Sequence, residues 1–522
     1  MSLPSSCEVL VIGGGIYGAW IACDAAERGL RTVLVERDDW GSGTSSASSK
    51  LIHGGLRYLE YGDVGLVAKA LRERARLLRL APHAVRPLRF LLPHGSDFRV
   101  NRFALMGGLF AYDLLAGARP GIPPHRAFAS EDLLRRAPFL RGSDLRGGWS
   151  YGDATEDDAR FVLELVDGAA TAGASVHSQC PAIRLLRANG RVCGALVRDT
   201  VANADAEIRA EVVVDAAGAW AGALCEPTGL PARHTKGVHL TLPPLPIDEA
   251  FLLQGGDRRV FFLIPFYGAT LVGTTDTDHR RADEAATITD ADVDYLLAGV
   301  NARCPGLGWT RADVRAGFAG IRTLRGAPGA PSSISREWEL WEPEPCHLLP
   351  LGGKYTSARV EAARTVDRCV EILGRDLPGT TATQGTPWAP SGAFAPWLAA
   401  QIRAGTDLGL DDTVAATLPR RHGTRSDALF TLVRSDPTLA ERLHPQAPFC
   451  RAEVVHAARH ERVHHLVDVL RRRVPLMILT RFDATVVADA ANLVASELGW
   501  DAQRHQREVE SVRRLWWAPA SS

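Results

Sequence analysis

The sequence predicts an α/β fold in three parts: a discontinuous domain built on a βαβ unit, a domain with a mixed sheet, and a helical carboxy-terminal domain. Three observations predict this fold. The chain opens with a short apolar strand, a glycine-rich turn and an alanine-rich helix. Strand-like segments lie close together between residues 240 and 341, and after residue 396 almost every segment has helical periodicity.

The bulk properties fit a protein of several domains. The chain has 522 residues, of which 46% are hydrophobic and 23% charged, and it carries no formal net charge. That length allows two or three domains with a sizeable core. The neutral balance gives no indication of a nucleic-acid partner, and we expect none.

Cysteines and apolar runs bear on the location of the protein. The nine cysteines form no Cys-x-x-Cys pair, which argues against iron–sulfur clusters, structural zinc and a disulfide scaffold. No secretory signal is visible, and the longest apolar run, 103–116, is too short to span a bilayer. We therefore expect a cytoplasmic protein, with attachment to the inner face of the cell membrane as a further hypothesis.

The first element is a buried strand over 8–12, followed by Gly13-x-Gly15-x-x-Gly18, a helix over 16–28 and a second strand over 31–36. Glycines in such a turn let a pyrophosphate approach the helix N-terminus. Glu36 ends the second strand, where a carboxylate accepts hydrogen bonds from a ribose and disfavours a 2′-phosphate. The segment predicts a dinucleotide site of Rossmann type, for FAD or NAD, rather than an ordinary glycine turn.

The remaining elements follow in order. We expect a basic helix over 66–80, an irregular insertion over 86–138, a helix over 161–172 and a strand over 211–215 that leads to Gly218. Further strands are expected over 260–264, 270–273 and 334–341, and then a helix over 356–373. Later helices are expected near 424–434, 450–474, 483–498 and 501–515.

These elements suggest domain boundaries. Residues 1–85, 146–230 and 346–377 are expected to form the nucleotide-binding domain, and 86–145 with 231–345 the mixed-sheet domain. The segment 378–396 is rich in Thr, Gly, Pro and Ala, which predicts a linker before a helical domain over 397–522.

A specific resemblance begins with the block Ser45-Ser46-Ala47-Ser48-Ser49-Lys50-Leu51-Ile52-His53-Gly54-Gly55-Leu56-Arg57-Tyr58. It resembles the signature segment of FAD-dependent glycerol-3-phosphate dehydrogenases, within the glycine- and D-amino-acid-oxidase-like flavoproteins. Further blocks agree in the same order and cover nearly the whole chain: Tyr151-Gly152-Asp153, Asp157-Asp158-Ala159-Arg160, Asp215-Ala216-Ala217-Gly218, Lys236-Gly237-Val238-His239, Arg259-Val260-Phe261-Phe262, Gly273-Thr274-Thr275-Asp276, Gly320-Ile321-Arg322, Ser335-Arg336, Gly352-Gly353-Lys354, Arg421-His422-Gly423 and Arg459-His460-Glu461.

The resemblance implies a fold and a reaction. The fold would be α/β, with a Rossmann-type FAD-binding domain, a mixed-sheet substrate domain and a helical C-terminal domain. The enzyme would oxidise sn-glycerol 3-phosphate to dihydroxyacetone phosphate by hydride transfer to FAD N5 and pass the electrons to a membrane quinone. The oligomeric state stays open, a homodimer included.

The resemblance also implies which residues surround FAD. Gly352-Gly353-Lys354 precedes a helix, whose positive N-terminal end would favour an anionic reduced flavin. The expected cofactor residues are Gly13, Gly14, Gly15, Gly18, Glu36, Arg37, Thr44, Ser45, Ser46, Ser49, Lys50, His53, Gly54, Gly55, Gly218, Gly353, Lys354 and Thr356.

The substrate phosphate needs several fixed cations, and arginine binds phosphate through two parallel hydrogen bonds. The resemblance places Arg57, Tyr58, Arg322, Arg336 and Lys354 near the substrate. Arg322 is the leading phosphate ligand among them. Without that motif context, any one arginine would be interpreted as a surface residue.

Oxidation of a secondary alcohol requires a base for the hydroxyl proton, and a neutral histidine suits that role. His53 is the first candidate and His239 the second. The alternative for either histidine is that it only orients the flavin or the substrate.

Two departures from the family pattern concern the cofactor contacts. Tyr355 stands where an aliphatic residue is usual, and Ala219 where proline is usual.

In the helical part, His456, His460 and His464 recur every four residues on one expected helix. That spacing can present metal ligands, but the matching family stretch is not a metal site, so we expect a packing or solvated face and no metal.

Three rival functions stay open. An oxidase would pass its electrons to oxygen, and no residue separates it from a quinone-linked dehydrogenase. An amino-acid or amine oxidase should lack the phosphate-binding arginines. A flavin-containing tRNA-modifying or binding protein should show a basic face, which the neutral charge does not favour.

Membrane contact is a separate hypothesis. Basic residues beside exposed apolar ones can seat a protein on anionic lipid. The alternative is that the apolar residues pack inside the mixed-sheet domain. The residues concerned are Arg86, Arg89, Arg99 and Arg102, with Phe90, Phe98, Phe103, Leu105 and Leu109.

Overall fold

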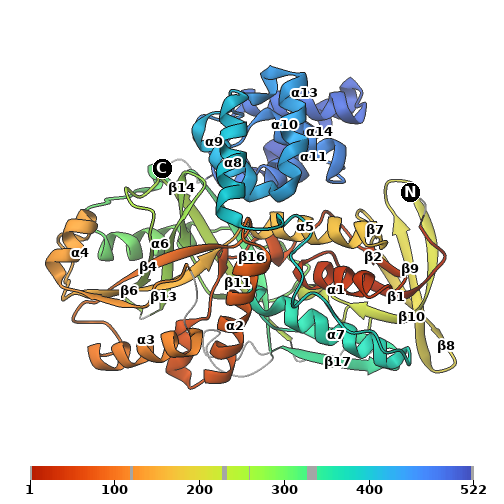
Figure 1. The fold of residues 1–522 in the computed structure, drawn as a ribbon, viewed down its shortest axis with the longest axis horizontal. Helices are drawn as coiled ribbons and strands as arrows, with labels where there is room; N and C mark the ends of the chain where they lie inside the picture. The colour runs from red at the N-terminus through yellow and green to blue at the C-terminus, as the bar shows by residue number, and fades with distance from the viewer. Residues whose placement is uncertain (1–2, 118–120, 226–231, 258, 326–337, 519–522) are drawn as a thin grey trace.

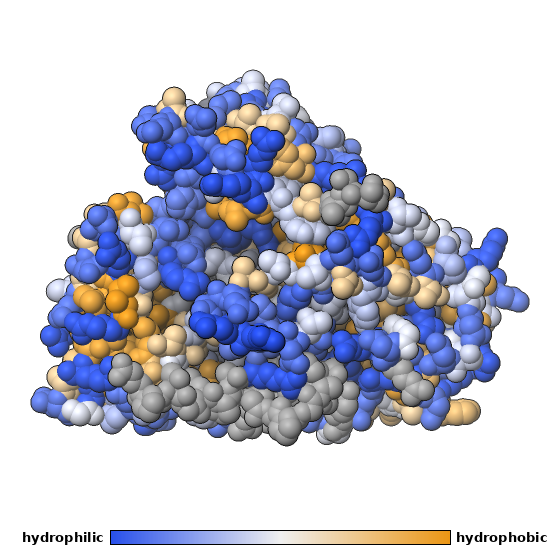
Figure 2. All heavy atoms as spheres, turned by 180° about the vertical axis from the view of Figure 1, so that it is seen from behind, coloured by the Kyte–Doolittle hydropathy of each residue, from blue (hydrophilic) through white to orange (hydrophobic). Residues whose placement is uncertain are grey.

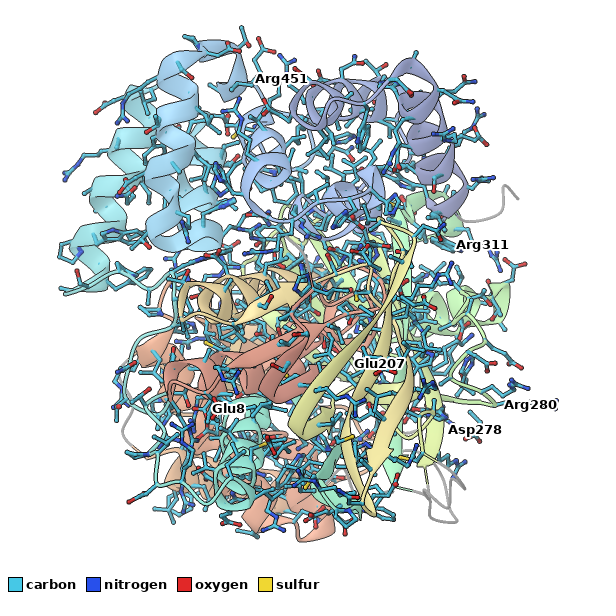
Figure 3. The ribbon with its side chains drawn as sticks, turned by 90° about the vertical axis from the view of Figure 1, so that its right-hand side faces the viewer. Glu8, Glu207, Asp278, Arg280, Arg311 and Arg451 are labelled. Atoms are coloured by element: carbon cyan, nitrogen blue, oxygen red, sulfur yellow. The ribbon has the colours of Figure 1, made fainter. Side chains whose placement is uncertain are left out.

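The computed structural model describes residues 3–117, 121–225, 232–257, 259–325 and 338–518. Two sheets and a helical domain make up most of this part of the chain (Figure 1). In Figure 1 the sheets lie side by side and the carboxy-terminal helices, coloured blue, lie above them. Turned by 90° (Figure 3), the helical domain again lies above the sheets. The α/β fold with a helical carboxy-terminal domain is confirmed.

Within the described residues the first sheet has eight strands, and it contains the predicted βαβ unit. β1 (Ser6–Ile12) pairs in parallel with β2 (Thr32–Val35) and β10 (Ala204–Asp215), and α1 (Ile16–Glu27) connects β1 to β2. Successive residues at the end of β1 are all buried, as in a parallel strand covered on both faces. The other strands are β7 (Ser175–His177), β8 (Ala182–Ala188), β9 (Arg191–Asp199), β17 (Glu339–Glu344) and β18 (His347–Leu351).

Helices cover the first sheet and bury its apolar side chains. α5 (Asp158–Thr171) and α7 (Ala358–Ile372) pack against α1, and the three share one hydrophobic core with β1 and β10. The expected helices over 161–172 and 356–373 are confirmed. The expected basic helix over 66–80 is confirmed as α2 (Val64–Leu80).

The second sheet has ten strands in the part of the chain that the structure describes. It is mixed, as expected, because β4 and β12 pair in parallel whereas β11 pairs antiparallel with β14 and β16. α6 (Asp290–Arg303) packs on it in one core, and α3 (Arg102–Ala116) contributes to another. The strands are β3 (Leu51–Ile52), β4 (Arg86–Pro93), β5 (Arg126–Phe128), β6 (Gly148–Thr155), β11 (Ala232–Leu242), β12 (Ala250–Gln254), β13 (Val260–Phe266), β14 (Ala269–Gly273), β15 (Thr277–His279) and β16 (Ala316–Arg325).

The expectation of an irregular insertion over 86–138 is wrong. β4, α3, β5 and α4 (Ser130–Arg136) occupy it. Prolines at both ends of β4 obscure the strand in the sequence. Pairing with β6 on one side and β12 on the other supplies its backbone partners.

Sheet membership also differs from the expected domain boundaries. The sequence groups β3 and β6 with the nucleotide-binding domain, yet β6 pairs with both β3 and β4 in the second sheet. Conversely, residues 339–341 of the expected strand 334–341 belong to β17, which pairs with β18 in the first sheet. Residues 334–337 lie outside the described ranges. Strand pairing is a long-range choice that local periodicity does not encode.

The helical domain departs from expectation at one point. The expected helix 450–474 stops at His460, and Arg462 has a φ of 52°. Glu461 lies at this break and accepts two hydrogen bonds from Arg160 of α5, at 2.8 and 2.7 Å. The helices are α8 (Phe394–Asp407), α9 (Asp412–His422), α10 (Ser426–Ser435), α11 (Arg451–His460), α12 (Leu466–Asp468), a π-helical turn Val469–Arg473, α13 (Ala484–Leu498) and α14 (Ala502–Leu515).

The segment 378–396 contains no helix before α8 begins at Phe394, but it is firmly packed. Trp388 is buried, and its backbone N–H donates to Glu164 of α5 at 2.9 Å. Within the described ranges, no helix is long and apolar enough to cross a membrane.

Candidate functional site

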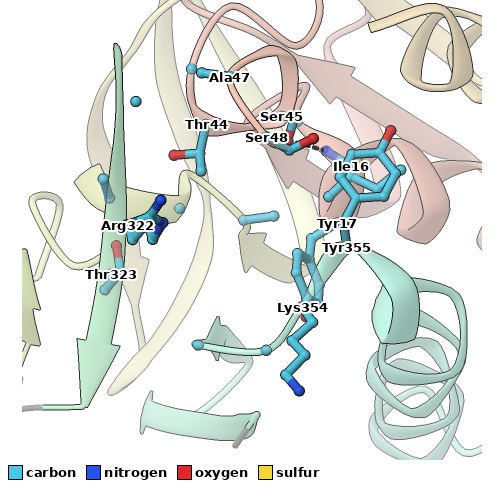
Figure 4. A pocket seen from close by; sticks show the side chains of 18 of the residues that line it. Ile16, Tyr17, Thr44, Ser45, Ala47, Ser48, Arg322, Thr323, Lys354 and Tyr355 are labelled. Atoms are coloured by element: carbon cyan, nitrogen blue, oxygen red, sulfur yellow. Dashed lines mark hydrogen bonds between the residues drawn. The ribbon is translucent and has the colours of Figure 1, made fainter. Parts of the chain in front are cut away.

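A cavity of about 510 Å³ runs from the carboxyl ends of β1 and β2 to the second sheet (Figure 4). Its wall combines residues from segments far apart in the sequence, including the first glycine turn, residues 42–58, β16 and the turn over residues 352–356 that leads into α7. The predicted site residues in the wall are Gly13, Gly15, Glu36, Arg37, Thr44, Ser45, Ser49, His53, Gly55, Arg57, Tyr58, Gly218, Arg322, Gly353, Lys354 and Thr356.

The glycine turn shapes one end of this cavity. Gly13 has a φ of 105°, and a Cβ at Gly18 would lie 1.8 Å from the Gly13 carbonyl oxygen. Gly18 therefore allows close packing of α1 on the turn rather than lining the cavity. The Ile16 N–H, at the start of α1, donates to Ser45 Oγ at 2.9 Å (Figure 4). This end presents a helix N-terminus to the cavity, which favours an anionic group.

Glu36 lies beside the same turn. Its two carboxylate oxygens accept hydrogen bonds from the Gly14 N–H at 2.6 Å and the Asp38 N–H at 2.8 Å. Burial raises the pKa of Glu36, and these backbone hydrogen bonds oppose that shift. The neighbouring Arg37 guanidinium lies 4.7 Å from the centre of the Trp220 ring, which also lines the cavity.

The turn over residues 352–356, which leads into α7, forms another part of the wall. Gly353 has a φ of 81°, and a Cβ there would lie 1.8 Å from the Tyr17 hydroxyl oxygen. Lys354 Nζ lies 3.6 Å from the centre of the Tyr58 ring. Tyr355, one of the two departures, donates its hydroxyl to the Asp158 carbonyl at 2.6 Å, so it ties this helix start to α5. Ala219, the other departure, is buried in the cavity wall.

Cations gather at the end formed by the second sheet. Arg322 donates to Thr274 Oγ1 at 2.7 Å and lies 3.3 Å from Asp276 Oδ1. A Cβ at Gly237 would lie 2.1 Å from Arg322 Nη2, so this glycine makes room for the guanidinium. Arg57 and Arg259 also line the cavity. Arg336 lies outside the described residues.

Sequence reasoning missed Arg259 as a site residue. It immediately precedes β13, and its guanidinium donates a hydrogen bond to the Asp276 carbonyl oxygen at 3.0 Å. The signal was present, because Arg259 opens one of the family-like blocks, but arginine is so common in this chain that position alone did not single it out.

The two candidate histidines have different surroundings. His53 lines the cavity, and its backbone N–H donates to Thr356 Oγ1 at 3.1 Å. His239 is 1% exposed and lies outside the wall, with its Nε2 2.9 Å from Ser49 Oγ. Burial, together with Arg322, lowers the pKa of His239 well below its usual value. The geometry therefore makes His239 a neutral support and leaves His53 facing the cavity.

Several expected cofactor residues lie behind the wall. Lys50 is buried and pairs with Asp158 at 2.6 Å, and Ser46 accepts a hydrogen bond from Lys50 Nζ through its carbonyl at 2.8 Å. The Gly54 N–H donates to the Tyr112 hydroxyl at 2.9 Å. These residues, with Gly14 and Gly18, hold the lining segments in place and are absent from the wall.

Comparisons with known proteins place this site in context. A family model described as FAD dependent oxidoreductase matches residues 8–340, and one described as C-terminal domain of alpha-glycerophosphate oxidase matches residues 381–505. Glycerol-3-phosphate dehydrogenase 2 of Mycobacterium tuberculosis is 37% identical over 96% of this chain and 86% of its own length. The aerobic glycerol-3-phosphate dehydrogenase of Bacillus subtilis is 31% identical, with 97% and 94% covered.

A solved structure is similar over almost the whole chain. It is the glycerol-3-phosphate dehydrogenase from Bacillus halodurans complexed with FAD, with a TM-score of 0.78 and 29% identity. The match covers 98% of this chain and 94% of that one. The likeness therefore includes the helical domain as well as both sheets.

Proposed function

Because this chain belongs to the family of FAD-dependent glycerol-3-phosphate dehydrogenases, we infer that it oxidises sn-glycerol 3-phosphate to dihydroxyacetone phosphate with FAD. The observation that carries the substrate is the set of four cations that line the cavity, Arg57, Arg259, Arg322 and Lys354, called the cation cluster below. A small alcohol with a phosphate dianion matches such a cluster.

The residues present fit FAD. The cavity is long enough to join a dinucleotide turn at Gly13 and Gly15 to a reaction end at His53 and Arg322. Space beside the glycine turn is tight, because a Cβ at Gly15 would lie 3.0 Å from Ser45 Oγ. The glycine turn and Glu36 would hold the adenosine and pyrophosphate, and the start of α7 would face the flavin. When bound, FAD supplies the acceptor for the hydride that leaves the substrate carbon.

The chain's own residues would then bind the substrate phosphate, take up the hydroxyl proton and position the wall. Arg322 would hold the phosphate with Arg57, and Lys354 would add a further positive charge to the lining. An imidazole nitrogen of His53 would take the proton of the substrate's central hydroxyl. His239 and Ser49 would keep the wall behind that hydroxyl in place, because their hydrogen bond links β11 to the 42–58 block.

The reaction is tested directly by the absorbance of the purified holoprotein. Anaerobic glycerol 3-phosphate should bleach the flavin bands, whereas glycerol at the same concentration should leave them largely unchanged. The reason is that glycerol has no phosphate for the cation cluster to hold. Equal bleaching by both alcohols, or none by either, would contradict the proposed substrate.

Arg322→Ala should lower kcat/KM for glycerol 3-phosphate by about ten- to a hundredfold, since a charged hydrogen bond is worth roughly 1.5–3 kcal/mol. Arg322→Lys should recover part of this, because it keeps the charge but loses the two-pronged guanidinium. Steady-state kinetics with glycerol provide the control. An equal proportional loss on both alcohols would mean that Arg322 acts mainly through its ion pair with Asp276.

A membrane quinone is the proposed electron acceptor. Oxygen is the alternative, because the family model that matches the carboxy-terminal domain is described by the name of an oxidase. Support for a membrane acceptor comes from α3, which carries an exposed apolar stripe of Phe103 (78% exposed), Met106 (48%), Phe110 (64%) and Leu114 (73%). Of the residues in the sequence hypothesis, Phe90, Leu105 and Leu109 are instead buried. Arg102 begins α3, where a cation favours anionic lipid, whereas Arg99 precedes the helix and pairs with Glu60. Quinone reduction measured against hydrogen peroxide release distinguishes the two acceptors.

Replacing Phe103 and Phe110 together by aspartate should weaken binding to vesicles containing phosphatidylglycerol, measured by sedimentation, by at least about a hundredfold, because each phenylalanine contributes roughly 1.5–3 kcal/mol when buried. Val201→Asp is the matched control, since Val201 is 64% exposed on another part of the surface. Loss of binding in the control as well, or no binding by the unaltered protein at low salt, would remove α3 as the contact.

A further inference from the structure

A second, smaller pocket lies where the helical domain meets the first sheet domain. Its volume is about 110 Å³, compared with about 30 Å³ for a water molecule in the liquid. Figure 2 shows the helical domain above the body of the molecule, with hydrophobic side chains at the seam between them. The pocket's polar and aromatic walls include Trp40, Trp388, Arg425, His456, His460 and Arg462.

Two residues that line this pocket, Trp40 and His456, each carry a buried polar atom without a hydrogen-bond partner in the described part of the chain. Trp40 is 1% exposed and His456 is 4% exposed. Across the described ranges, neither Trp40 Nε1 nor His456 Nδ1 has a hydrogen-bond partner. Buried polar groups are nearly always hydrogen-bonded, because an unmet donor loses its water without compensation. Both atoms therefore indicate that something polar belongs in the pocket.

The mouth of the pocket is positively charged. Arg425 and Arg462 have side chains that are 46% and 33% exposed, and both lie near Asp167. Asp167 also accepts a hydrogen bond from Trp388 Nε1 at 2.9 Å. One carboxylate thus faces two guanidinium groups. Burial lowers the pKa of Arg462, with further lowering by Arg425 that Asp167 opposes.

The other acidic group that lines the pocket, Glu461, already has a cationic partner. Both oxygens of Glu461 accept hydrogen bonds from Arg160. Ligand atoms of His422, His456 and Glu461 lie within 4.8 Å of one another, which is a metal-like grouping. However, Arg160 Nη2 also lies 3.0 Å from His422 Nδ1, so a fixed guanidinium stands among the three. A cation is disfavoured there and an anion is favoured.

We propose that this pocket is a second oxyanion site, which takes inorganic phosphate or the phosphate group of a small phosphomonoester. The donors would be Trp40 Nε1 and the guanidinium groups of Arg425 and Arg462. None of them belongs to the cation cluster of the FAD cavity, so the site does not rest on the proposed substrate.

Trp40 connects this site to the dinucleotide turn. A Cβ at Gly14 would lie 2.5 Å from Trp40 Cε3, so this edge of the indole abuts the turn. Nε1 lies on the opposite long edge of the ring. An oxyanion that accepts a hydrogen bond from Nε1 would hold the indole against Gly14. Bound phosphate should therefore slow the release of FAD.

The test uses FAD-loaded Arg322→Gln protein, in which the cation cluster of the main cavity is weakened. Equilibrium dialysis with radiolabelled phosphate, at constant ionic strength, should still detect binding at a single site. Adding Arg462→Gln should weaken that binding by about ten- to a hundredfold, the effect of one charged hydrogen bond. Phosphate should also slow FAD release in Arg322→Gln but not in the double variant.

Arg459→Gln in the same background is the matched control. Arg459 lies on α11 but pairs with Glu497 away from the pocket, and its loss should leave phosphate binding unchanged. If Arg462→Gln loses its flavin during purification, Arg425→Gln provides the same comparison. If glycerol 3-phosphate displaces the radiolabelled phosphate, the site accepts a small phosphomonoester. If it does not, the ligand is free inorganic phosphate. Failure of Arg322→Gln to bind phosphate, or equal binding by all the variants, would overturn the proposal.

Discussion

Replacement of His53 by glutamine is expected to lower the rate of flavin reduction by about 10²–10⁴, the range typical of a lost general base. His53 lines the cavity, and its backbone is held by Thr356 at the start of α7. Its ring meets Phe262 edge-on, with 6.4 Å between the ring centres. Glutamine retains the polarity but cannot take up a proton at neutral pH. Anaerobic stopped-flow absorbance with glycerol 3-phosphate measures this step separately from reoxidation.

His239→Gln is the comparison that gives this result its meaning. His239 is buried behind Ser49, so its loss should slow flavin reduction less than about tenfold, as expected for one hydrogen bond to a neutral group. Both variants should keep their FAD. A larger loss in His239→Gln than in His53→Gln would reverse the assignment of the base.

Gly15→Val is expected to yield protein without bound FAD and hence without activity. Gly15 has φ −79° and ψ −174°, a backbone conformation that valine also adopts, so the substitution tests space and not backbone strain. A Cβ there would already lie 3.0 Å from Ser45 Oγ, and the valine methyl groups would enter the region where a pyrophosphate approaches α1. The ratio of flavin to protein absorbance after purification is the measurement.

Gly65→Val controls for the general cost of adding a branched side chain. Gly65 is an exposed residue of α2, and a Cβ there would meet no atom within 4 Å. This variant should purify with as much FAD as the unaltered protein. Full flavin occupancy in Gly15→Val would place the dinucleotide elsewhere, whereas flavin loss in Gly65→Val would make flavin content an unreliable measure of the site.

Short-range patterns were enough to predict the parts of the site that depend on neighbouring residues. The first glycine turn requires glycines at Gly13 and Gly18 because the strand and helix meet within a few residues. The 45–58 block and the Gly320-Ile321-Arg322 block are also local, and both supply residues of the cavity wall. Such features need no knowledge of how distant segments pair.

Short-range patterns did not predict which of these residues line the cavity and which lie behind its wall. Lys50 and His53 lie in one block, yet Lys50 pairs with Asp158 of α5 whereas His53 reaches the cavity. His53 and His239 are chemically identical in the sequence and differ only in what covers them. The same limit explains the strand β17, whose pairing with β18 moves it from the expected sheet to the other one.

The sequence by itself determined the fold class, the dinucleotide turn and the set of cationic and histidine residues from which a flavoenzyme site is built, because each of these depends on residue type and near-neighbour spacing. Only the tertiary structure decided which of these side chains face the cavity, which face of α3 is exposed, and that Trp40 lies between the dinucleotide turn and a cationic pocket of the helical domain. Those outcomes depend on burial and on contacts between segments hundreds of residues apart, and these arise only when the two sheets and the helical domain pack together.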